Sequence, residues 1–509
     1  MNPIMPDTSS SIQIPSPILM TGVQTNNLLE EWDNWAKEPK RGVWNEFRGR
    51  AVAKLKDCFA KNAVYLDLSE LGLSSLPKHL PPSVVDLNLS HNQLGELKLA
   101  NLSKLQGLNL DTGGLTKLEL ENLPALIKIN AGSNELQHFI LDNLPKLKVL
   151  QLSYNQLQDI KLTNLPALEQ LDAGNNELKD TINPDNELKN AIILDNIPSL
   201  KELSLHDNQL TRISLENLSK LELLNVNNNK LTELPLENLT ALEKIYASKN
   251  QLNKLSLVNL PALQELDVSI NLLTDFVSNS WPVIEKLDIS RNKLASLTLA
   301  LTHLPALKSL SINRNELTSL PENLYQALPS LRILEASINR LTYLPAILPL
   351  LTLLRIEHNQ LSRISGAIQM LPVEGQVYIE GNPIDPNMRS ALERLIAAGD
   401  YTGPRIYFSM QPISSNDQII RPLFEVVTEC LGQCDERWRE IEKEPNTRYL
   451  SHFLDSLRKT VNYENAGFKL KVSEWLTRLA DKENESVRRQ CQRYFRLTTF
   501  CYFKMSSFC

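Results

Sequence analysis

The sequence lacks any run of 18 or more apolar residues, so no transmembrane helix is expected. Its first residues also lack the basic and apolar segments of a cleaved secretory signal, which indicates that any export takes another route. Cysteines are absent from the regular repeats described below, because one lies at position 58 and the other five lie at or after position 430. This distribution favours a reducing environment over a disulfide-stabilised one.

An excess of positive charge is missing as well, since the formal net charge of the 509 residues is −6. Nucleic-acid-binding proteins usually carry a basic stripe, and anionic membranes also attract basic surfaces. We therefore expect no nucleic acid among the partners. No ordered set of metal ligands or catalytic groups recurs along the chain, so neither a metal nor a cofactor is expected. The length leaves room for more than one domain.

The sequence does contain a short repeated unit, L-x-L-x-x-N-x-L, from about residue 66 to residue 384, most clearly in residues 87–94. Its Asn position recurs fifteen times, mostly at a spacing of 21 residues, and thirteen of these positions hold Asn. A period of about 20–29 residues with this consensus is typical of leucine-rich repeats. The predicted fold is an α/β leucine-rich repeat solenoid with a helical cap before it and an all-α segment after it.

The physical chemistry of the unit separates scaffold from surface. Each L-x-L is expected to form a short strand whose leucines point inward while the residues between them face outward. A single coil cannot bury its own flanks, so only stacking makes the core continuous. The Asn side chain is expected to bind backbone groups of neighbouring coils at the turn. Leucines and asparagines are thus scaffold, and binding belongs to the outward strand positions.

These outward positions are predicted to line one inner, concave face that binds a target protein. One residue from each of fourteen strands represents this face: Asn88, Asn109, Asn130, Gln151, Asp172, Ser204, Asn225, Tyr246, Asp267, Asp288, Ser311, Glu335, Arg355 and Tyr378. The face is polar, mildly acidic and poor in aromatic residues, which favours protein recognition over nucleic-acid binding. Two single histidines on or beside it, His206 and His358, are interpreted as surface residues and not as metal ligands.

Composition changes divide the chain into six segments. They are a disordered secretion or translocation tail (1–25), a helical cap (26–63), the repeats (64–386), a terminal helix and extended linker (387–417), a helical segment (418–490) and a divergent tail (491–509). An insertion at residues 180–190 lengthens one coil by eleven residues. It is either a partner contact or a degenerate half-repeat, and the second interpretation is favoured.

Several stretches resemble the IpaH/SspH-type secreted effectors of Gram-negative pathogens, which join leucine-rich repeats to a NEL (novel E3 ubiquitin ligase) domain. Residues 51–77 resemble the entry into the repeats of that family, and residues 381–383 and 401–410 resemble its linker between repeats and ligase. The opening helices of the ligase domain are matched by residues 421–423, 438, 453–457, 460 and 468–476. The resemblance implies a type III-like secretion route and action in the host cell cytoplasm.

The resemblance also implies a chemistry, in which a cysteine takes ubiquitin from a charged E2 as a thioester and passes it to a substrate lysine. A free thiol has a pKa of about 8.5, so this cysteine must be activated by its surroundings. The family motif is C-x-D. The corresponding site of this chain, Cys501-Tyr502-Phe503, lacks the Asp. Cys434-Asp435-Glu436 mimics the motif, but it matches an early, noncatalytic helix. Cys501 is the catalytic candidate, and its context predicts lost activity.

Two functions remain open. The first is a ligase by descent whose repeats select a host protein and whose transfer chemistry is lost by truncation or a disrupted reading frame, since residues 486–509 contain no acidic residue and six aromatic ones. The second is a non-catalytic repeat effector that acts as a binding scaffold. A membrane contact by the tail is disfavoured, because its five basic residues follow no helical apolar stripe.

Overall fold

The computed structural model describes most of the chain and divides it into two compact units, Met1–Asn229 and Lys230–Cys509, which are treated separately below. The described residues are 22–38, 46–182, 188–276, 281–297, 304–345, 350–364, 371–396, 401–408, 422–433, 435–444 and 466–485, with single residues at 368, 398, 447, 450, 451, 454 and 488. The predicted tail (1–25) lies outside this description except for its last four residues.

A helical hairpin precedes the first coil, as predicted. It consists of α1 (Gly22–Lys37) and α2 (Arg48–Ala60), so the first helix begins four residues before the predicted boundary. Trp32 is fully buried, contacts the ring of Phe59 edge-on and donates a hydrogen bond of 2.8 Å from Nε1 to the carbonyl of His79. The side chain of Cys58 is buried, and burial raises the pKa of its thiol.

The inner sheet of the first unit contains one three-residue strand from each coil. Its strands are β1 (Tyr65–Asp67), β2 (Asp86–Asn88), β4 (Gly107–Asn109), β6 (Lys128–Asn130), β8 (Val149–Gln151), β10 (Gln170–Asp172), β14 (Glu202–Ser204) and β15 (Leu223–Asn225). Each of these strands pairs in parallel, residue for residue, with the next inner strand. The middle residue of each strand is buried, as Leu87 and Leu108 illustrate, which is the predicted leucine core.

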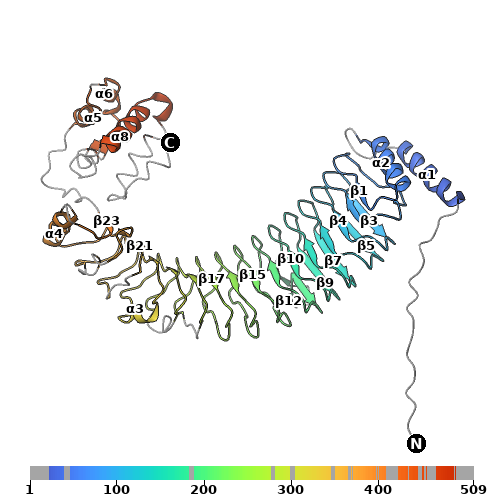
Figure 1. Cartoon of the computed structure of the whole chain (residues 1–509), viewed down its shortest axis with the longest axis horizontal. Helices are drawn as coiled ribbons and strands as arrows, with labels where there is room; N and C mark the ends of the chain where they lie inside the picture. Colours follow the sequence, from blue (N-terminus) through green and yellow to red (C-terminus); the bar gives the residue numbers. More distant parts are fainter. Residues whose placement is uncertain are drawn as a thin grey trace, which may run out of the picture. The chain divides into compact units, whose positions relative to one another are not determined.

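The second unit repeats this arrangement (Figure 1). Its inner strands are β16 (Lys244–Tyr246), β17 (Glu265–Asp267), β18 (Lys286–Asp288), β19 (Ser309–Ser311), β20 (Ile333–Glu335), β21 (Leu353–Arg355), β22 (Gln376–Tyr378) and β23 (Arg405–Tyr407). Two helices interrupt the coils, α3 (Leu324–Ala327) and α4 (Pro386–Ile396). The strand β23 corrects the prediction of an extended linker, because this segment pairs with β22 and extends the sheet by one strand.

A second set of strands lies on the coils of the first unit and was not predicted. It comprises β3 (Glu96–Ala100), β5 (Lys117–Glu121), β7 (His138–Asp142), β9 (Asp159–Thr163) and β13 (Ile192–Asp195). The eleven-residue insertion forms part of an antiparallel hairpin, β11 (Thr181–Ile182) with β12 (Leu188–Lys189), and not a half-repeat. The carboxylate of Asp180 closes this hairpin by accepting hydrogen bonds from the backbone N–H groups of Ala191 and Thr211.

The repeated Asn makes the contacts expected of it. In Asn292, Nδ2 donates to the carbonyls of Val268 and Ile289, each at 3.1 Å, and Oδ1 accepts from the N–H of Leu273 at 3.0 Å. The side chain is buried and joins two neighbouring coils. Where the repeat has Gly113 in place of Asn, the N–H of this glycine donates instead to the following coil's Asn134.

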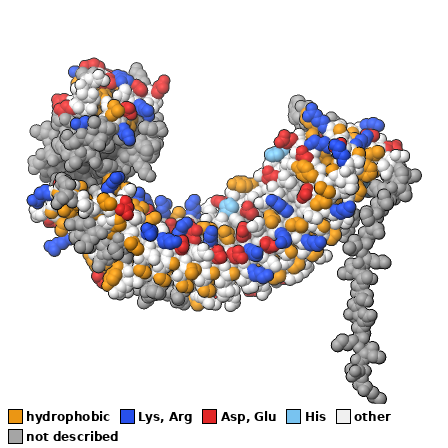
Figure 2. Space-filling view, viewed as in Figure 1, with side chains coloured by type: hydrophobic (Ala, Val, Ile, Leu, Met, Phe, Trp, Pro, Cys, Tyr) orange, Lys and Arg blue, Asp and Glu red, His pale blue; other side chains and the backbone are white. Residues whose placement is uncertain are grey.

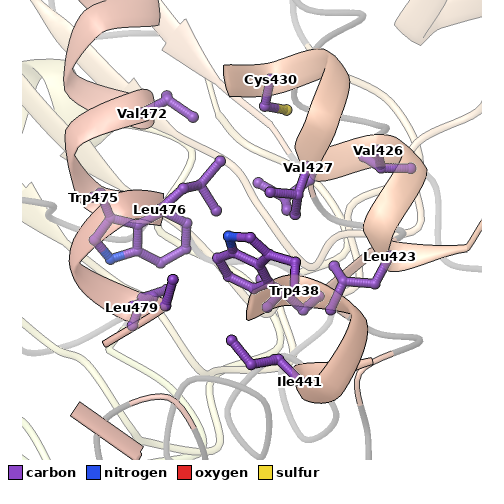
Figure 3. Packing of buried hydrophobic residues seen from close by; sticks show 13 residues of the cluster. Leu423, Val426, Val427, Cys430, Trp438, Ile441, Val472, Trp475, Leu476 and Leu479 are labelled. Carbon is purple, nitrogen blue, oxygen red and sulfur yellow. The ribbon is translucent and has the colours of Figure 1, made fainter. Parts of the chain in front are cut away.

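The C-terminal helices share one hydrophobic core (Figure 3). They are α5 (Leu423–Leu431), α6 (Arg437–Ile441) and α8 (Ala466–Leu479), followed by the 3-10 helix η3 (Lys482–Asn484). Trp438 is fully buried between α5 and α8, where it faces Val427 and Leu476. Trp475 and Leu476 are both buried in this cluster. No described helix has the length and apolarity needed to cross a bilayer.

Candidate binding face of the repeats

The predicted binding residues form two continuous rows, one in each unit. Each is the last residue of its inner strand, and the parallel register places it beside its counterpart in the next coil, as for Asn88 and Asn109 or Asp267 and Asp288. All fourteen are partly exposed. The structure therefore brings the predicted residues together on the same side of each inner sheet, although the binding role itself remains a prediction.

Many of these residues also stabilise the turn that follows their strand, a role that the sequence analysis missed. The Oδ1 atoms of Asp267 and Asp288 each accept a hydrogen bond of 2.9 Å from the backbone N–H two residues later. The same contact is made by Asn88, Asn109, Asn130, Asp172 and Asn225. The preference for Asp and Asn at this position was the available signal, because their short side chains favour such turns.

Hydrogen bonds between coils order the face further. Asn109 donates from Nδ2 to Oδ1 of Asn88 at 3.0 Å, and Asn88 donates in the same way to Asp67 at 3.2 Å. Side chains held in this way lose little conformational freedom when a partner binds, so less of the binding free energy is lost to ordering. This part of the face is preorganised by the repeat.

Ion pairs flank the rows. Glu169 lies between two lysines, at 2.9 Å from Lys148 and 3.4 Å from Lys201, and a similar pair joins Lys286 to Glu265 at 3.5 Å. Figure 2 shows basic and acidic side chains intermixed along the visible surface of the repeats. Such exposed pairs contribute about 0–1 kcal/mol each to stability, so a charged partner can replace them at little cost.

His206 belongs to a hydrogen-bonded network. Its Nδ1 lies 2.9 Å from Oγ of Ser204, and its Nε2 lies 3.0 Å from Nδ2 of Asn175. The ring occupies the space where a side chain at Gly174 would lie, since a Cβ there would approach Cε1 to 2.1 Å. The glycine therefore makes room for the imidazole. These contacts account for both ring nitrogens, and the interpretation of His206 as a surface residue and not a metal ligand stays a prediction.

Aromatic residues gather at the end of the row in the second unit. The rings of Tyr378 and Tyr407 stack with centroids 4.5 Å apart, and the guanidinium of Arg355 lies 4.6 Å from the centre of the Tyr378 ring. The same guanidinium is 3.6 Å from Glu335 and 3.5 Å from Glu357. Tyr407 was missed because its segment was predicted to be a linker, and only the pairing of β23 places it here.

Glu380 is the least satisfied acid of this region. Only 3% of the residue is exposed, and its Oε2 has no hydrogen-bond partner within the part of the chain that the structure describes. Burial raises the pKa of this carboxyl to about 7; the nearby charge of Glu357 acts in the same direction, and that of Arg355 opposes it. Asp288 shows a smaller effect of the same kind, because burial and the charges of Asp267 and Glu335 raise its pKa.

The cysteine candidates cannot be placed in this site. Cys501 and Cys434 both lie outside the described residues, so the predicted catalytic role stays a prediction. Cys430 is buried in the helical core of α5 and lines no described surface. Within the described ranges, no group of three or more His, Cys, Asp or Glu side chains could hold a metal ion.

Comparison with known families identifies both parts of the chain. Residues 199–221 and 282–341 match leucine-rich repeat models, and residues 426–500 match the family described as "C-terminal novel E3 ligase, LRR-interacting". The chain is a leucine-rich repeat protein in which residues 426–500 are similar to the NEL family. This finding confirms the predicted resemblance, and the shared core of α5, α6 and α8 lies within the NEL match except for Leu423.

The curated relatives carry ligase names. The chain is 36% identical over 125 residues to the E3 ubiquitin-protein ligase ipaH9.8 of Shigella dysenteriae, an alignment that covers 23% of each chain. It is also 36% identical over 114 residues to the E3 ubiquitin-protein ligase SlrP of Salmonella typhimurium, with 22% of this chain and 15% of SlrP covered. The chain thus spans a quarter or less of the length of these relatives.

Among solved structures, the fold is similar to a Leptospira interrogans leucine-rich repeat protein. The two are 24% identical with a TM-score of 0.50, and the match covers 70% of this chain and 98% of the other. At this level of identity the comparison establishes the repeat fold alone.

Proposed function

We propose that this protein binds a host protein through the inner face of its repeats, as an effector of the NEL family. The observation that carries the proposal is the pair of in-register rows, in which polar side chains of neighbouring strands are held in fixed positions by turns and by ladders such as that of Asn88 and Asn109. A surface of this kind suits a folded protein, because it offers many weak polar contacts at a low entropic cost.

The proposed route to the partner is a type III-like secretion into the host cell cytoplasm. The support is the likeness to ligases of Shigella and Salmonella. Repeats without cysteines are compatible with the reducing cytoplasm that this route implies.

The proposed relation to ubiquitin transfer is one of descent. A working NEL ligase would receive ubiquitin from a charged E2 on its catalytic cysteine, and the candidate in this chain is Cys501. The family match ends at residue 500, and the residue two positions after Cys501 is Phe503 in place of Asp. A thiol without its acidic partner is poorly activated near neutral pH. We therefore propose that transfer activity is lost.

An in vitro reaction with E1, a charged E2 and ubiquitin tests the loss of activity. The expected result is no polyubiquitin chain and no thioester on the protein under non-reducing conditions. Formation of a thioester that disappears in Cys501→Ala but persists in Cys434→Ala would refute the proposed loss and identify the nucleophile.

A second candidate function is a binding scaffold that acts without any ligase chemistry. It uses the same inner face, and the presence of Phe503 in place of Asp also favours it.

Binding is tested with the variant Gln151→Arg, Tyr246→Arg, Ser311→Arg, which changes inner-face residues that form none of the Asp and Asn turns described above. Captured host proteins should be lost from this variant and retained by Lys161→Glu, a control charge change on β9, which lies outside the inner sheet. Identical capture by all three chains would contradict the proposed face.

A further inference from the structure

In the second unit, the residue two positions beyond the inner strand is acidic only in the coils of β21 and β22 among the coils of β16 to β22. From β16 to β22, the position two residues beyond the inner strand holds, in order, Ser248, Ser269, Ser290, Asn313, Ser337, Glu357 and Glu380. Five coils therefore form this turn with a small neutral side chain, so the repeat itself does not require an acid there. The register of Arg355 with Tyr378 places the two glutamates, each two residues further on, in neighbouring coils.

Glu380 is buried and forms no ion pair with a cation among the described residues. Its Oε2 has no hydrogen-bond partner among them, and an ionised carboxylate in such a place is unfavourable unless a positive charge joins it. Burial raises the pKa of Glu380 to about 7, so the group is close to half ionised at neutral pH. An unsatisfied acid of this kind is found more often at binding sites than in a structural core.

The available cation is already shared. Arg355 lies between Glu335 and Glu357 at 3.6 and 3.5 Å, so three carboxylates depend on one guanidinium. One oxygen of Glu357 also accepts a short hydrogen bond from the hydroxyl of Ser337. The other titratable groups beside the pair are Tyr378, Tyr407 and His358, whose Nδ1 lies 2.4 Å from where a Cβ on Gly381 would be. The region has an excess of negative charge.

The adjacent tyrosines favour a cationic ligand, as the excess of negative charge does. Arg355 already packs on the face of Tyr378, and Tyr407 extends the stack on the other side. Aromatic faces attract cations, and the attraction grows as water is excluded. Carboxylates and aromatic rings in contact favour an ammonium or guanidinium group over a neutral or acidic one.

We propose that the Glu357–Glu380 pair and the Tyr378–Tyr407 stack, together named the basic-residue subsite, receive one lysine or arginine side chain of the bound protein. The proposal rests on the proposed inner-face binding and names the chemistry by which the partner is recognised. The partner is accordingly a protein that presents a basic side chain at the point that meets β21, β22 and β23. A divalent cation is a poorer fit, because the described residues offer no group of three metal ligands.

Binding of a cation at this subsite is linked to a proton. A positive charge favours the ionised form of Glu380, so binding releases the proton that the empty site holds below pH 7. The affinity therefore rises with pH through this range and levels off above it. For a pKa of about 7, one linked proton changes the affinity about tenfold between pH 6 and pH 8.

The test uses the full chain and two glycine-serine peptides that differ only at a central lysine or acetyl-lysine, titrated by ligand-observed NMR, which detects weak binding. At pH 8 the lysine peptide is expected to bind at least about tenfold more tightly than the acetyl-lysine peptide. At pH 6 its affinity should be about tenfold lower than at pH 8. The acetyl-lysine peptide should show no pH dependence. Glu380→Gln should remove the pH dependence and most of the preference for lysine, whereas the matched change Glu202→Gln on β14 should preserve both.

Equal binding of the two peptides, or an unaltered pH dependence in Glu380→Gln, overturns the basic-residue subsite. Folding is checked separately by thermal denaturation, in which Glu380→Gln should be at least as stable as the wild type at pH 8, because a neutral amide leaves no buried charge. The two proposals fail differently. Loss of host-protein capture in the inner-face variant together with unchanged binding in Glu380→Gln keeps the proposed function and rejects the subsite.

Discussion

The buried asparagine of each repeat satisfies backbone groups that no other side chain can reach. Asn292→Ala leaves the N–H of Leu273 and the carbonyls of Val268 and Ile289 without these partners inside the core. Each unsatisfied buried group costs about 1–3 kcal/mol, so we expect a loss of at least about 2 kcal/mol in the free energy of unfolding. Urea denaturation measures it, with the exposed Gln251→Ala as control. A loss no larger than that of the control would contradict this role.

A second prediction at this scale concerns the residue before each repeated asparagine, which adopts a left-handed conformation in every described coil that has one. At Ile338, φ is +56°, an unfavourable value for a β-branched side chain that is 39% exposed. Ile338→Asn should stabilise the chain by about 1 kcal/mol, because Asn tolerates this conformation. Thermal denaturation compares it with Ile338→Val, which keeps the branch and should bring no gain.

At the scale of elements, a buried ion pair within the helical cap connects the cap to the first coil through hydrogen bonds with Ser74 and Ser75. Nε of Arg48 lies 3.0 Å from Oε1 of Glu46, and both residues are almost fully buried. The guanidinium also donates to the carbonyl of Trp35 and to Oγ of Ser75. Burial alone would raise the pKa of Glu46, but hydrogen bonds from Ser74 and Arg48 hold it below its ordinary value.

This ion pair predicts that pH affects the stability of the wild type and of the variant Arg48→Met in opposite directions. In the wild type the folded pKa of Glu46 is depressed, so its stabilising contribution is present above the unfolded pKa of about 4.3 and is lost as the pH falls. In Arg48→Met the buried carboxylate has no cation, so we expect a loss of about 3–5 kcal/mol near pH 7 that becomes smaller in acid. Denaturant titrations at pH 4 and pH 7 measure it. In the double variant Glu46→Gln, Arg48→Met this pH effect should be absent.

The strand β23 supports a prediction about the end of the sheet. Its residues pair with β22, and Tyr407 stacks on Tyr378, so the segment belongs to the sheet of the second unit. We expect a shortened chain that ends at residue 399 to be less stable than one that ends at residue 408 by at least about 1 kcal/mol, the lower range of an aromatic pair with its burial. Thermal denaturation of the two chains decides this, and equal midpoints would show that β23 adds nothing.

At the scale of the whole molecule, the two parts of the chain support different expectations. The repeats present polar rows on the inner strands, and the NEL segment buries Trp438, Trp475 and Leu476 in a core of its own. We therefore expect proteolysis to release a resistant helical fragment that retains residues 423–479, as measured by mass spectrometry. Its rapid complete digestion would mean that these helices do not form a stable core.

The repeat pattern allowed much of this structure to be predicted. The leucine core, the bonding of Asn292 and the alignment of Asn88 with Asn109 all follow from a 21-residue period, because each coil meets only its neighbours and the same contacts recur. Irregular parts were predicted less well. The pairing of β11 with β12 and the pairing of β23 with β22 each occur once in the chain. The repeat period therefore does not predict them.

The candidate site shows the same division. Its rows were predicted because alternation along a strand determines which side chains face outward. The roles of Asp267 and Asp288 in their turns required the geometry, since an outward carboxylate can as easily face solvent as accept a backbone N–H. The unsatisfied state of Glu380 was beyond the reach of the sequence, because burial of one atom depends on everything packed around it.

The amino-acid sequence by itself determined the stacked coils, the inner rows and the resemblance to the NEL family, since these depend on local period and on matching residues. Tertiary structure decided where the last strand pairs, how the insertion folds and which acid lacks a cation. Those features arise from contacts between residues far apart in the chain, whose energies depend on distance, burial and neighbouring charge rather than on residue order.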